Sequence, residues 1–499
     1  MQNKVQLITY VDRLTAGGLK QLRELLNGPL EGVFGGAHLL PFFTPIDGAD
    51  AGFDPSEHTQ VDPRLGNWTD VGELGRNVEL MADLIVNHVS RDSPQFQDFL
   101  KLGSKSEFAG MFLTYERVFP HGATEAELLR IYRPRPGLPF AVVSLKTGEP
   151  RLLWTTFTPQ QIDIDVKHPH GVAYLDAILD RFQQVGVKII RLDAAGYAIK
   201  KPGSTCFMIP ETYEFIGALT QKAHARGIEA LVEIHSHYLQ QVEIARRVDR
   251  VYDFALPPLV LHALFKGDSR FLKKWLAISP RNAVTVLDTH DGIGVIDVGA
   301  DATDREARPG LLDPSEIDEL VETIHVRSHG QSRKATGAAA SNLDLYQVNC
   351  TFYDALGCCD TEYLIARAIQ FFAPGVPQVY YVGLLAGKND MDLLNRNGVG
   401  RDINRHYYTP NEVTAALATP VVSALLALIR FRNGHPAFEG EFQVRDSSDR
   451  MLSLQWKRGE EWARLEVDLA TPTATIEYSS REGVRRQVVS PNPGQGNSQ

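Results

Sequence analysis

The chain has 499 residues, of which 43% are hydrophobic and 22% are charged, and its formal net charge at pH 7 is −10. This composition is typical of a folded globular protein and excludes a largely disordered chain. The acidic balance argues against nucleic acid as the main partner. The length predicts about three domains.

The sequence gives no reason to expect a membrane segment or an export signal. No run approaches about 18 uninterrupted apolar residues, so no membrane span is expected. The first residues, MQNKVQLITYVDR, lack a cationic region followed by a long apolar run, so we expect no signal peptide. The spacing of the four cysteines fits neither a zinc site nor a disulfide framework. We therefore expect reduced thiols in a cytoplasmic protein.

Strand-like and helix-like segments alternate along most of the chain. The expected strands lie in 5–11, 32–43, 79–88, 185–193, 228–235, 248–257, 282–288 and 376–383. The expected helices lie in 17–26, 171–186, 209–227, 239–248, 271–279, 360–372 and 419–434. Eight strands alternating with helices predict an α/β fold, a parallel (β/α)₈ barrel with its active site at the C-terminal ends of the strands.

Two long segments interrupt this alternation, and the pattern changes near the end. Residues 89–167 and 293–357 are expected to be inserted subdomains that shape the pocket. The segment TGAAASN in the second insert is either a flexible surface loop or a gate. The barrel would then comprise 1–88, 168–292 and 358–437. Residues 438–499 contain short alternating runs that predict a small antiparallel β domain.

Acidic residues end three of the strand-like runs. They are Asp193 in the fourth run, Glu233 in the fifth and Asp288 in the seventh. A carboxylate at the end of a buried strand is costly unless it is paired or used, so any one of these could be structural. Three acids in the same position indicate a functional site.

Two of these acids are expected to differ in protonation. Arg191 lies two residues before Asp193, so both side chains point the same way and the guanidinium should keep Asp193 ionised. Glu233 follows the apolar residues ALV, which could raise its pKa and keep it protonated. One anionic and one protonated carboxyl group are what a retaining glycosidase uses.

Other polar and aromatic residues near the strand ends leave alternatives open. His290 and Asp291 could bind sugar hydroxyls. Phe53 and Tyr197 could face the sugar or pack in the core.

A metal site is a further alternative. Asp50, His88, His290 and Asp291 could form a ligand set, and His235 and His237 form an HxH pair. No HExxH pattern supports a zinc site, so we expect no metal.

Several segments carry a family resemblance. The segments DLIVNH, IIRLDAAGY, EALVEIH and VLDTHD resemble, in order and spacing, the motifs of the α-amylase superfamily, glycoside hydrolase family 13. The segments PFFTPIDGADAGFDP, IYRPRPGLPF, SNLDLYQVN and GRDINRHYY narrow the resemblance to the sucrose phosphorylase family. The resemblance covers nearly all of residues 1–437.

This resemblance implies roles for matching residues. Asp193 would be the nucleophile, Glu233 the general acid/base and Asp291 the transition-state stabiliser. The glucosyl subsite would consist of Asp50, Phe53, His88, Arg191, His290 and Arg401. The residues around fructose or phosphate would be Tyr132, Pro134, Arg135, Tyr197, His235, Leu343, Asp344, Leu345, Tyr346 and Gln347, of which Arg135, Leu345 and Tyr346 would hold phosphate.

The resemblance also implies a reaction. Sucrose and inorganic phosphate would give α-glucose 1-phosphate and fructose with retention, through a covalent β-glucosyl-enzyme and two carboxyl groups about 5–5.5 Å apart. Asp344 would repel a phosphate dianion and Arg135 would bind it, so we hypothesise that the 338–347 loop moves between the half-reactions. No cofactor, metal, nucleic acid or membrane partner is expected, and the chain would be a monomer or a homodimer.

The sequence is also compatible with other functions. A phosphorylase for sucrose 6′-phosphate or glucosylglycerate and a sucrose hydrolase share this chemistry. A non-catalytic barrel that serves as a binding module or transporter subunit is a different class, and the retained acids argue against it.

Overall fold

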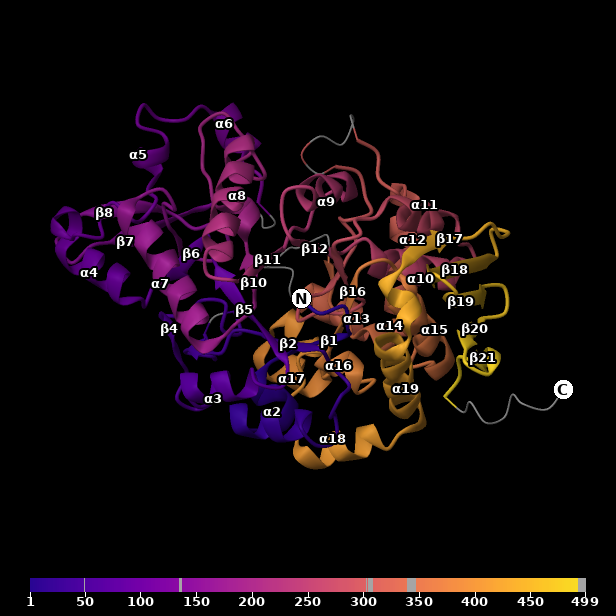
Figure 1. Ribbon diagram of the computed structural model, residues 1–499. Helices are drawn as coiled ribbons and strands as arrows, with labels where there is room; N and C mark the ends of the chain where they lie inside the picture. Colours follow the sequence, from indigo (N-terminus) through magenta and orange to yellow (C-terminus); the bar gives the residue numbers. More distant parts are fainter. Residues whose placement is uncertain (49, 134–136, 302, 304–307, 339–346, 492–499) are drawn as a thin grey trace.

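The computed structural model describes residues 1–48, 50–133, 137–301, 303, 308–338 and 347–491 (Figure 1). A closed barrel of eight parallel strands lies at its centre, which confirms the predicted (β/α)₈ architecture. The barrel strands, in chain order and in order around the barrel, are β1 (Gln6–Thr9), β2 (Gly36–Leu39), β5 (Glu79–Ile85), β10 (Ile189–Asp193), β11 (Glu229–Val232), β12 (Arg250–Asp253), β13 (Ala283–Thr285) and β16 (Val376–Tyr380).

Helices follow the barrel strands in turn. They are α2 (Leu19–Leu26), α3 (Trp68–Leu74), α7 (Pro169–Val185), α8 (Pro210–His224), α9 (Tyr238–Ala245), the pair α10 (Leu256–Lys266) and α11 (Arg270–Ile278), α15 (Asp360–Phe372) and α19 (Pro420–Gly434). The sequence patterns did not predict α3 or α10. Helix α10 is apolar on all sides because it is buried along its length, so it lacks the periodic polar face of a surface helix.

Helix α7 shows how the sequence sets one of these elements. Pro169 occupies the first turn, where its missing N–H and fixed φ are tolerated, and His168 accepts a hydrogen bond from the His170 N–H. Leu175, Ile178, Leu179 and Phe182 recur at helical spacing and are buried against the barrel. The helix ends at Gly186, whose φ of 82° is left-handed.

The two inserts carry short elements. The first contains β6 (His88–Ser90), α4 (Pro94–Leu102), α5 (Tyr115–Val118), α6 (Glu125–Arg130), β7 (Phe140–Ser144), β8 (Pro150–Trp154) and β9 (Gln161–Asp163). The second contains β14 (Ile293–Gly294), α12 (Pro314–Arg327), α13 (Gln331–Ala338), β15 (Gln347–Val348) and α14 (Phe352–Ala355). Strand β6 pairs with β9, and β14 pairs with β15, so each insert is tied back at the catalytic end of the barrel.

Some segments differ from the expected pattern. The first and last barrel strands end earlier than predicted, because α1 (Val11–Thr15) and α16 (Tyr381–Leu384) begin directly after them. Helix α13 begins before TGAAASN, where Gln331, Arg333 and Lys334 favour a helix, and covers only its residues 336–338. Further elements are β3 (Phe43–Thr44), β4 (Glu57–Val61), α17 (Met391–Asn397) and α18 (Pro410–Leu417).

The C-terminal segment forms one antiparallel sheet, as predicted. Its five strands, in spatial order, are β17 (Glu441–Val444), β18 (Met451–Arg458), β19 (Glu461–Asp468), β20 (Thr473–Ser480) and β21 (Gly483–Val488). In Figure 1 this sheet and the β7–β8 hairpin lie at opposite sides of the barrel.

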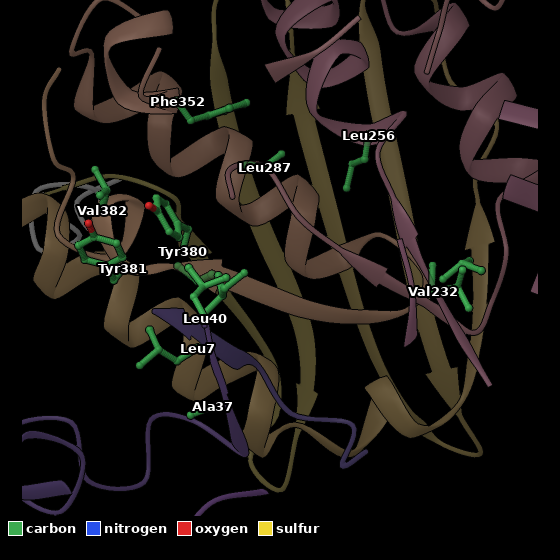
Figure 2. Packing of buried hydrophobic residues seen from close by; sticks show 14 of the residues in the cluster. Leu7, Ala37, Leu40, Val232, Leu256, Leu287, Phe352, Tyr380, Tyr381 and Val382 are labelled. Carbon is green, nitrogen blue, oxygen red and sulfur yellow. The ribbon is translucent and has the colours of Figure 1, made fainter. Parts of the chain in front are cut away.

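A continuous apolar core joins the barrel to its helices. Leu7 of β1 pairs in register with Ala37 of β2, and Figure 2 shows both among the buried side chains of this core. Within the described residues, no single helix is long and apolar enough to cross a bilayer, and α18 with α19 meets that test only as a pair bent by 76°.

Candidate active site

A cavity of about 730 Å³, counting its open mouth, lies at the C-terminal ends of the barrel strands. Most of the predicted site residues that the structure describes line it. These are Asp50, Phe53, His88, Asp193, Tyr197, Glu233, His235, His290, Asp291, Gln347 and Arg401. Six further lining residues were not predicted: Phe157, Gln161, Ala194, Gly196, Phe207 and Ile234.

The Arg191 guanidinium is the centre of the acidic cluster at the floor of this cavity. Register between β10 and β5 places Arg191 opposite Asp83, and Nη1 donates to Asp83 Oδ1 at 2.7 Å. The same Nη1 donates to Asp193 Oδ1 at 2.8 Å, and Nη2 lies 2.8 Å from Glu233 Oε1. One buried cation therefore holds three carboxylates together, and it brings the predicted nucleophile and acid/base to one point.

The backbone after Asp193 contributes to the same arrangement. Ala194 has a φ of 55°, in the left-handed region, which costs a non-glycine residue about 1 kcal/mol or more. In this conformation its N–H points at Glu233 Oε2 at 3.5 Å. The turn therefore aims a backbone donor at the second carboxyl group.

Opposing influences act on the protonation of Asp193. Burial and the negative charge of Glu233 raise the pKa of Asp193 well above its ordinary value, although Arg191 lowers it. The Arg191 guanidinium is shared among three carboxylates and does not serve Asp193 alone.

Asp291 lies in a different electrostatic setting. Its Oδ1 is 2.9 Å from Arg401 Nη1 and 3.7 Å from Arg405 Nη2. Burial alone would raise the pKa of Asp291, but the guanidinium groups of Arg401 and Arg405 lower it below its ordinary value. Asp291 is therefore ionised.

The wall nearest the barrel axis is made of stacked rings and neutral imidazoles. Phe53 stacks on His290 with ring centroids 4.7 Å apart. His88 Nε2 lies 3.0 Å from the Phe53 carbonyl and 3.1 Å from Gln161 Nε2. Burial lowers the pKa of both His88 and His290, so these rings are neutral hydrogen-bonding groups.

A second wall is aromatic and combines the segment after β10, which supplies Tyr197 and Phe207, with Phe157 of the first insert. Tyr197 packs against Phe157 and Phe207, with centroids 5.2 and 4.7 Å away. Tyr132 does not line the cavity but stacks parallel to Tyr197 behind it, with centroids 6.4 Å apart. Gln347 reaches the cavity because β15 pairs with β14, which follows Asp291 in the chain.

Three ligating side chains approach one another closely enough to be considered as a cation site. Glu233, His235 and Asp291 each place one ligating atom within 4.8 Å of the others. Arg191 already contacts Glu233 and Arg401 contacts Asp291, so a bare cation would have to displace guanidinium groups. We assign no metal to this cluster.

Some predicted residues lie elsewhere or outside the described part of the chain. Asp288, counted as the third strand-end acid, does not line the cavity and pairs with Arg367 at 2.7 Å; Asp291 lines it instead. Strand β13 ends at Thr285, and the following turn decides which of the two faces inward. Pro134, Arg135, Leu343, Asp344, Leu345 and Tyr346 lie outside the described residues.

No family model matches the chain. Curated relatives match it over nearly its whole length. The chain is 64% identical to a sucrose phosphorylase of Agrobacterium vitis, over 96% of this chain and 98% of the relative. It is 54% identical to a sucrose phosphorylase of Bifidobacterium adolescentis, over 97% and 98%. Among solved structures, the sucrose 6F-phosphate phosphorylase of Thermoanaerobacter thermosaccharolyticum superimposes with a TM-score of 0.89 at 39% identity, covering 98% of each chain.

Proposed function

Because the chain belongs to the sucrose phosphorylase family, we propose that it transfers a glucosyl group from sucrose to inorganic phosphate, releasing fructose and α-glucose 1-phosphate. The observation that carries the proposal is the shared guanidinium: Arg191 contacts Asp193 and Glu233 together at the floor of a cavity large enough for a sugar. Paired carboxyl groups of this kind are the machinery of a retaining glycosidase.

In the first half-reaction, Glu233 protonates the glycosidic oxygen and Asp193 attacks C1 of the glucosyl unit. One proton shared by the pair leaves one protonated and one anionic carboxyl group, the combination that this step uses. The raised pKa of Asp193 supports such sharing, and substrate binding would place the proton on Glu233. Asp291, kept ionised by Arg401 and Arg405, would stabilise the positive charge that develops at the sugar ring.

In the second half-reaction, phosphate displaces Asp193 from C1, and Glu233 takes the proton from the attacking oxygen. Two inversions at C1 would give overall retention. The expected carboxyl separation of about 5–5.5 Å leaves no space for a water molecule between the pair.

The acceptor side is proposed to change between the two steps. Fructose would be held with Asp344 inward, and phosphate with Asp344 withdrawn and Arg135 engaged. Arg135→Ala should then raise the phosphate KM about tenfold or more and the sucrose KM much less, because a bidentate guanidinium contact is made only to phosphate. Equal changes in both constants would contradict this switch.

We also propose that residues 89–167 and 293–357 act as inserted subdomains that complete the acceptor side, and that 438–499 form a separate β domain. Support comes from the cavity lining, which takes Phe157 and Gln161 from the first insert and Gln347 from the second.

The proposed function has a direct assay. The protein is incubated with sucrose, with and without phosphate, and glucose 1-phosphate and free glucose are measured. Phosphate-dependent glucose 1-phosphate is expected. Free glucose alone would indicate a hydrolase, and no turnover would indicate a binding module. Preference for sucrose 6′-phosphate would assign the activity of the solved relative, which the higher identity to sucrose phosphorylases disfavours.

A further inference from the structure

Three histidines line the cavity, and His235 differs from the other two because its ring contacts a buried carboxylate. Burial holds His88 and His290 neutral by lowering the pKa of each ring. His235 is also buried, yet its Nδ1 lies 3.1 Å from a carboxylate oxygen of Asp297. Asp297 is fully buried, lies outside the cavity lining and has no part in the chemistry described above.

The Asp297 carboxylate is held in one orientation. Its Oδ1 accepts the Ser236 N–H at 3.1 Å and the Gln241 side-chain amide at 2.9 Å. These two donors leave Oδ2 to face His235 Nδ1. A Cβ on Gly294 would stand 2.5 Å from Asp297 Oδ2. Glycine is therefore needed for the β14 backbone to lie this close to the Asp297–His235 contact.

The His235 ring is held equally firmly. It stacks on Phe254 with centroids 3.8 Å apart and an interplanar angle of 15°. The His235 ring lines the cavity, and with Nδ1 turned to Asp297 its Nε2 faces Glu233, 3.9 Å from Oε1, where the nitrogen itself is buried. The donor or acceptor that His235 offers to an incoming substrate is therefore set by its partner on the far side of the ring.

The charges around His235 favour the imidazolium form. Asp297 follows β14, Glu233 follows β11 and Asp291 follows β13, and all three carboxylates face the ring. Burial would lower the pKa of His235, but these acids raise it above its ordinary value, with Asp297 first among them. His235 therefore keeps its proton to a higher pH than a free histidine, and loses it as the pH rises through the raised pKa.

A positively charged His235 would favour the binding of an anionic substrate in this cavity. The described cavity wall carries the acids Asp50, Asp193, Glu233 and Asp291, and the Arg401 guanidinium is engaged by Asp291. When phosphate enters, Asp193 is bonded to C1, so the dianion would still meet the acids Asp50, Glu233 and Asp291 of this wall. A charge-assisted donor at His235 Nε2 would offset part of that repulsion.

We propose that Asp297 is a positioning residue of the second half-reaction: it orients the His235 ring and keeps it charged, so that Nε2–H binds the phosphate that attacks the glucosyl-enzyme. This inference rests on the proposed function. In the step itself, a phosphate oxygen bonds to C1 and the C1–O bond to Asp193 breaks. The electron pair returns to Asp193 as a carboxylate, Glu233 takes the phosphate proton, and His235 keeps its own proton.

The test is Asp297→Asn, which preserves shape and removes charge. The Ser236 and Gln241 donors would hold the Asn oxygen, so its NH₂ group would face His235 Nδ1 and force a neutral ring that carries its proton on Nε2. The phosphate KM should rise about tenfold near neutral pH, the difference between a charge-assisted and a neutral hydrogen bond. The sucrose KM should change less than about threefold, because fructose hydroxyls need no charge.

The pH dependence separates this role from a structural one. The ratio of variant to wild-type phosphate KM cancels the titration of phosphate itself. That ratio should be largest below the His235 pKa and fall to one or below it at higher pH, because the neutral wild-type ring keeps its proton on Nδ1 beside Asp297 and Nε2 then no longer donates. A ratio that is independent of pH, or equal rises in both KM values, would overturn the proposal.

A control variant and a measurement on the wild type complete the test. Asp301→Asn is the matched control, because Asp301 is a buried acid of the same insert that bonds Thr303, and its variant should leave both KM values unchanged. If D297N does not fold, ¹⁵N-histidine NMR of the wild type reports the His235 ring directly. An imidazolium at pH 7 is expected, and a neutral ring in either tautomer would overturn the proposal. Absence of phosphate-dependent turnover in the wild type would instead refute the proposed function.

Discussion

Two fully buried arginines of this molecule, Arg191 and Arg367, differ in how many carboxylates each one contacts. Arg367 Nη2 donates to Asp288 at 2.7 Å, and its other contacts are to the neutral groups of Tyr363 and Gln370. Among the described residues, Arg191 contacts three carboxylates at 2.7–2.8 Å. Both clusters follow apolar barrel strands that look alike in sequence.

The difference separates a structural pair from a reactive one. A buried cation matched with one carboxylate and with neutral acceptors has its charge balanced and connects α15 to the segment after β13. A buried cation that faces three carboxylates leaves negative charge in excess. That excess is reduced when one carboxylate takes up a proton or forms a bond to a substrate carbon. We therefore read the imbalance at Arg191, and not the mere presence of buried acids, as the mark of the site.

The largest effect is expected from removing the carboxylate that would bond to carbon. Asp193→Asn should lower kcat about 10⁴-fold or more, because the amide cannot form the glucosyl ester. Steady-state release of glucose 1-phosphate measures this, with circular dichroism to confirm the fold. Turnover within tenfold of the wild type would refute the assignment.

Glu233→Gln should lower kcat with sucrose about 10³-fold, because the fructosyl leaving group would depart unprotonated. A glucosyl donor whose leaving group needs no proton, such as α-glucosyl fluoride, should recover most of the glucosylation rate. Equal losses with both donors would show that Glu233 is not the acid.

Substitution in the Asp288–Arg367 pair should lower stability and leave turnover nearly unchanged. Asp288→Asn leaves the Arg367 charge uncompensated and should lower the free energy of unfolding by about 3 kcal/mol. Urea denaturation measures the loss, and kcat of the folded protein at low temperature should stay within about twofold. A large fall in kcat without a loss of stability would mean that Asp288 belongs to the chemistry.

The pH profile gives the smallest and most specific effect. Burial and Glu233 raise the pKa of Asp193, so activity should fall on the acid side at a pH above the ordinary aspartate range. In Glu233→Gln the neighbouring negative charge is gone, so this acid limb of kcat/KM for glucosyl fluoride should move to lower pH by about one unit. An acid limb that stays in place would show that the two groups do not share a proton.

The sequence predicted the barrel well because each strand is a dense apolar run and the alternation with helices allows few topologies. It also located Asp193 and Glu233, since strand ends in this fold meet at one face. The sharing of Arg191 was not predictable, because it depends on the register that sets Arg191 beside Asp83 on a strand about 100 residues earlier.

The site residues from loops and short strands were harder still. Phe157 and Phe207 come from irregular segments, and Gln161 begins the three-residue strand β9, so no period predicts which way these side chains point. Counting Asp288 among the functional strand-end acids was wrong, because β13 ends at Thr285 and the irregular segment that follows sets which acid lines the cavity. Asp297 shows no pattern in sequence and is identified only by its contacts.

The central claim is that the excess charge at Arg191 is relieved by a bond between Asp193 and the glucosyl carbon. The direct measurement is mass spectrometry of Glu233→Gln after brief reaction with α-glucosyl fluoride and acid quenching, followed by peptic digestion. We predict one added glucosyl mass on the peptide that contains Asp193. Product formation with that peptide unmodified, or with the glucosyl group on another residue, would contradict the account.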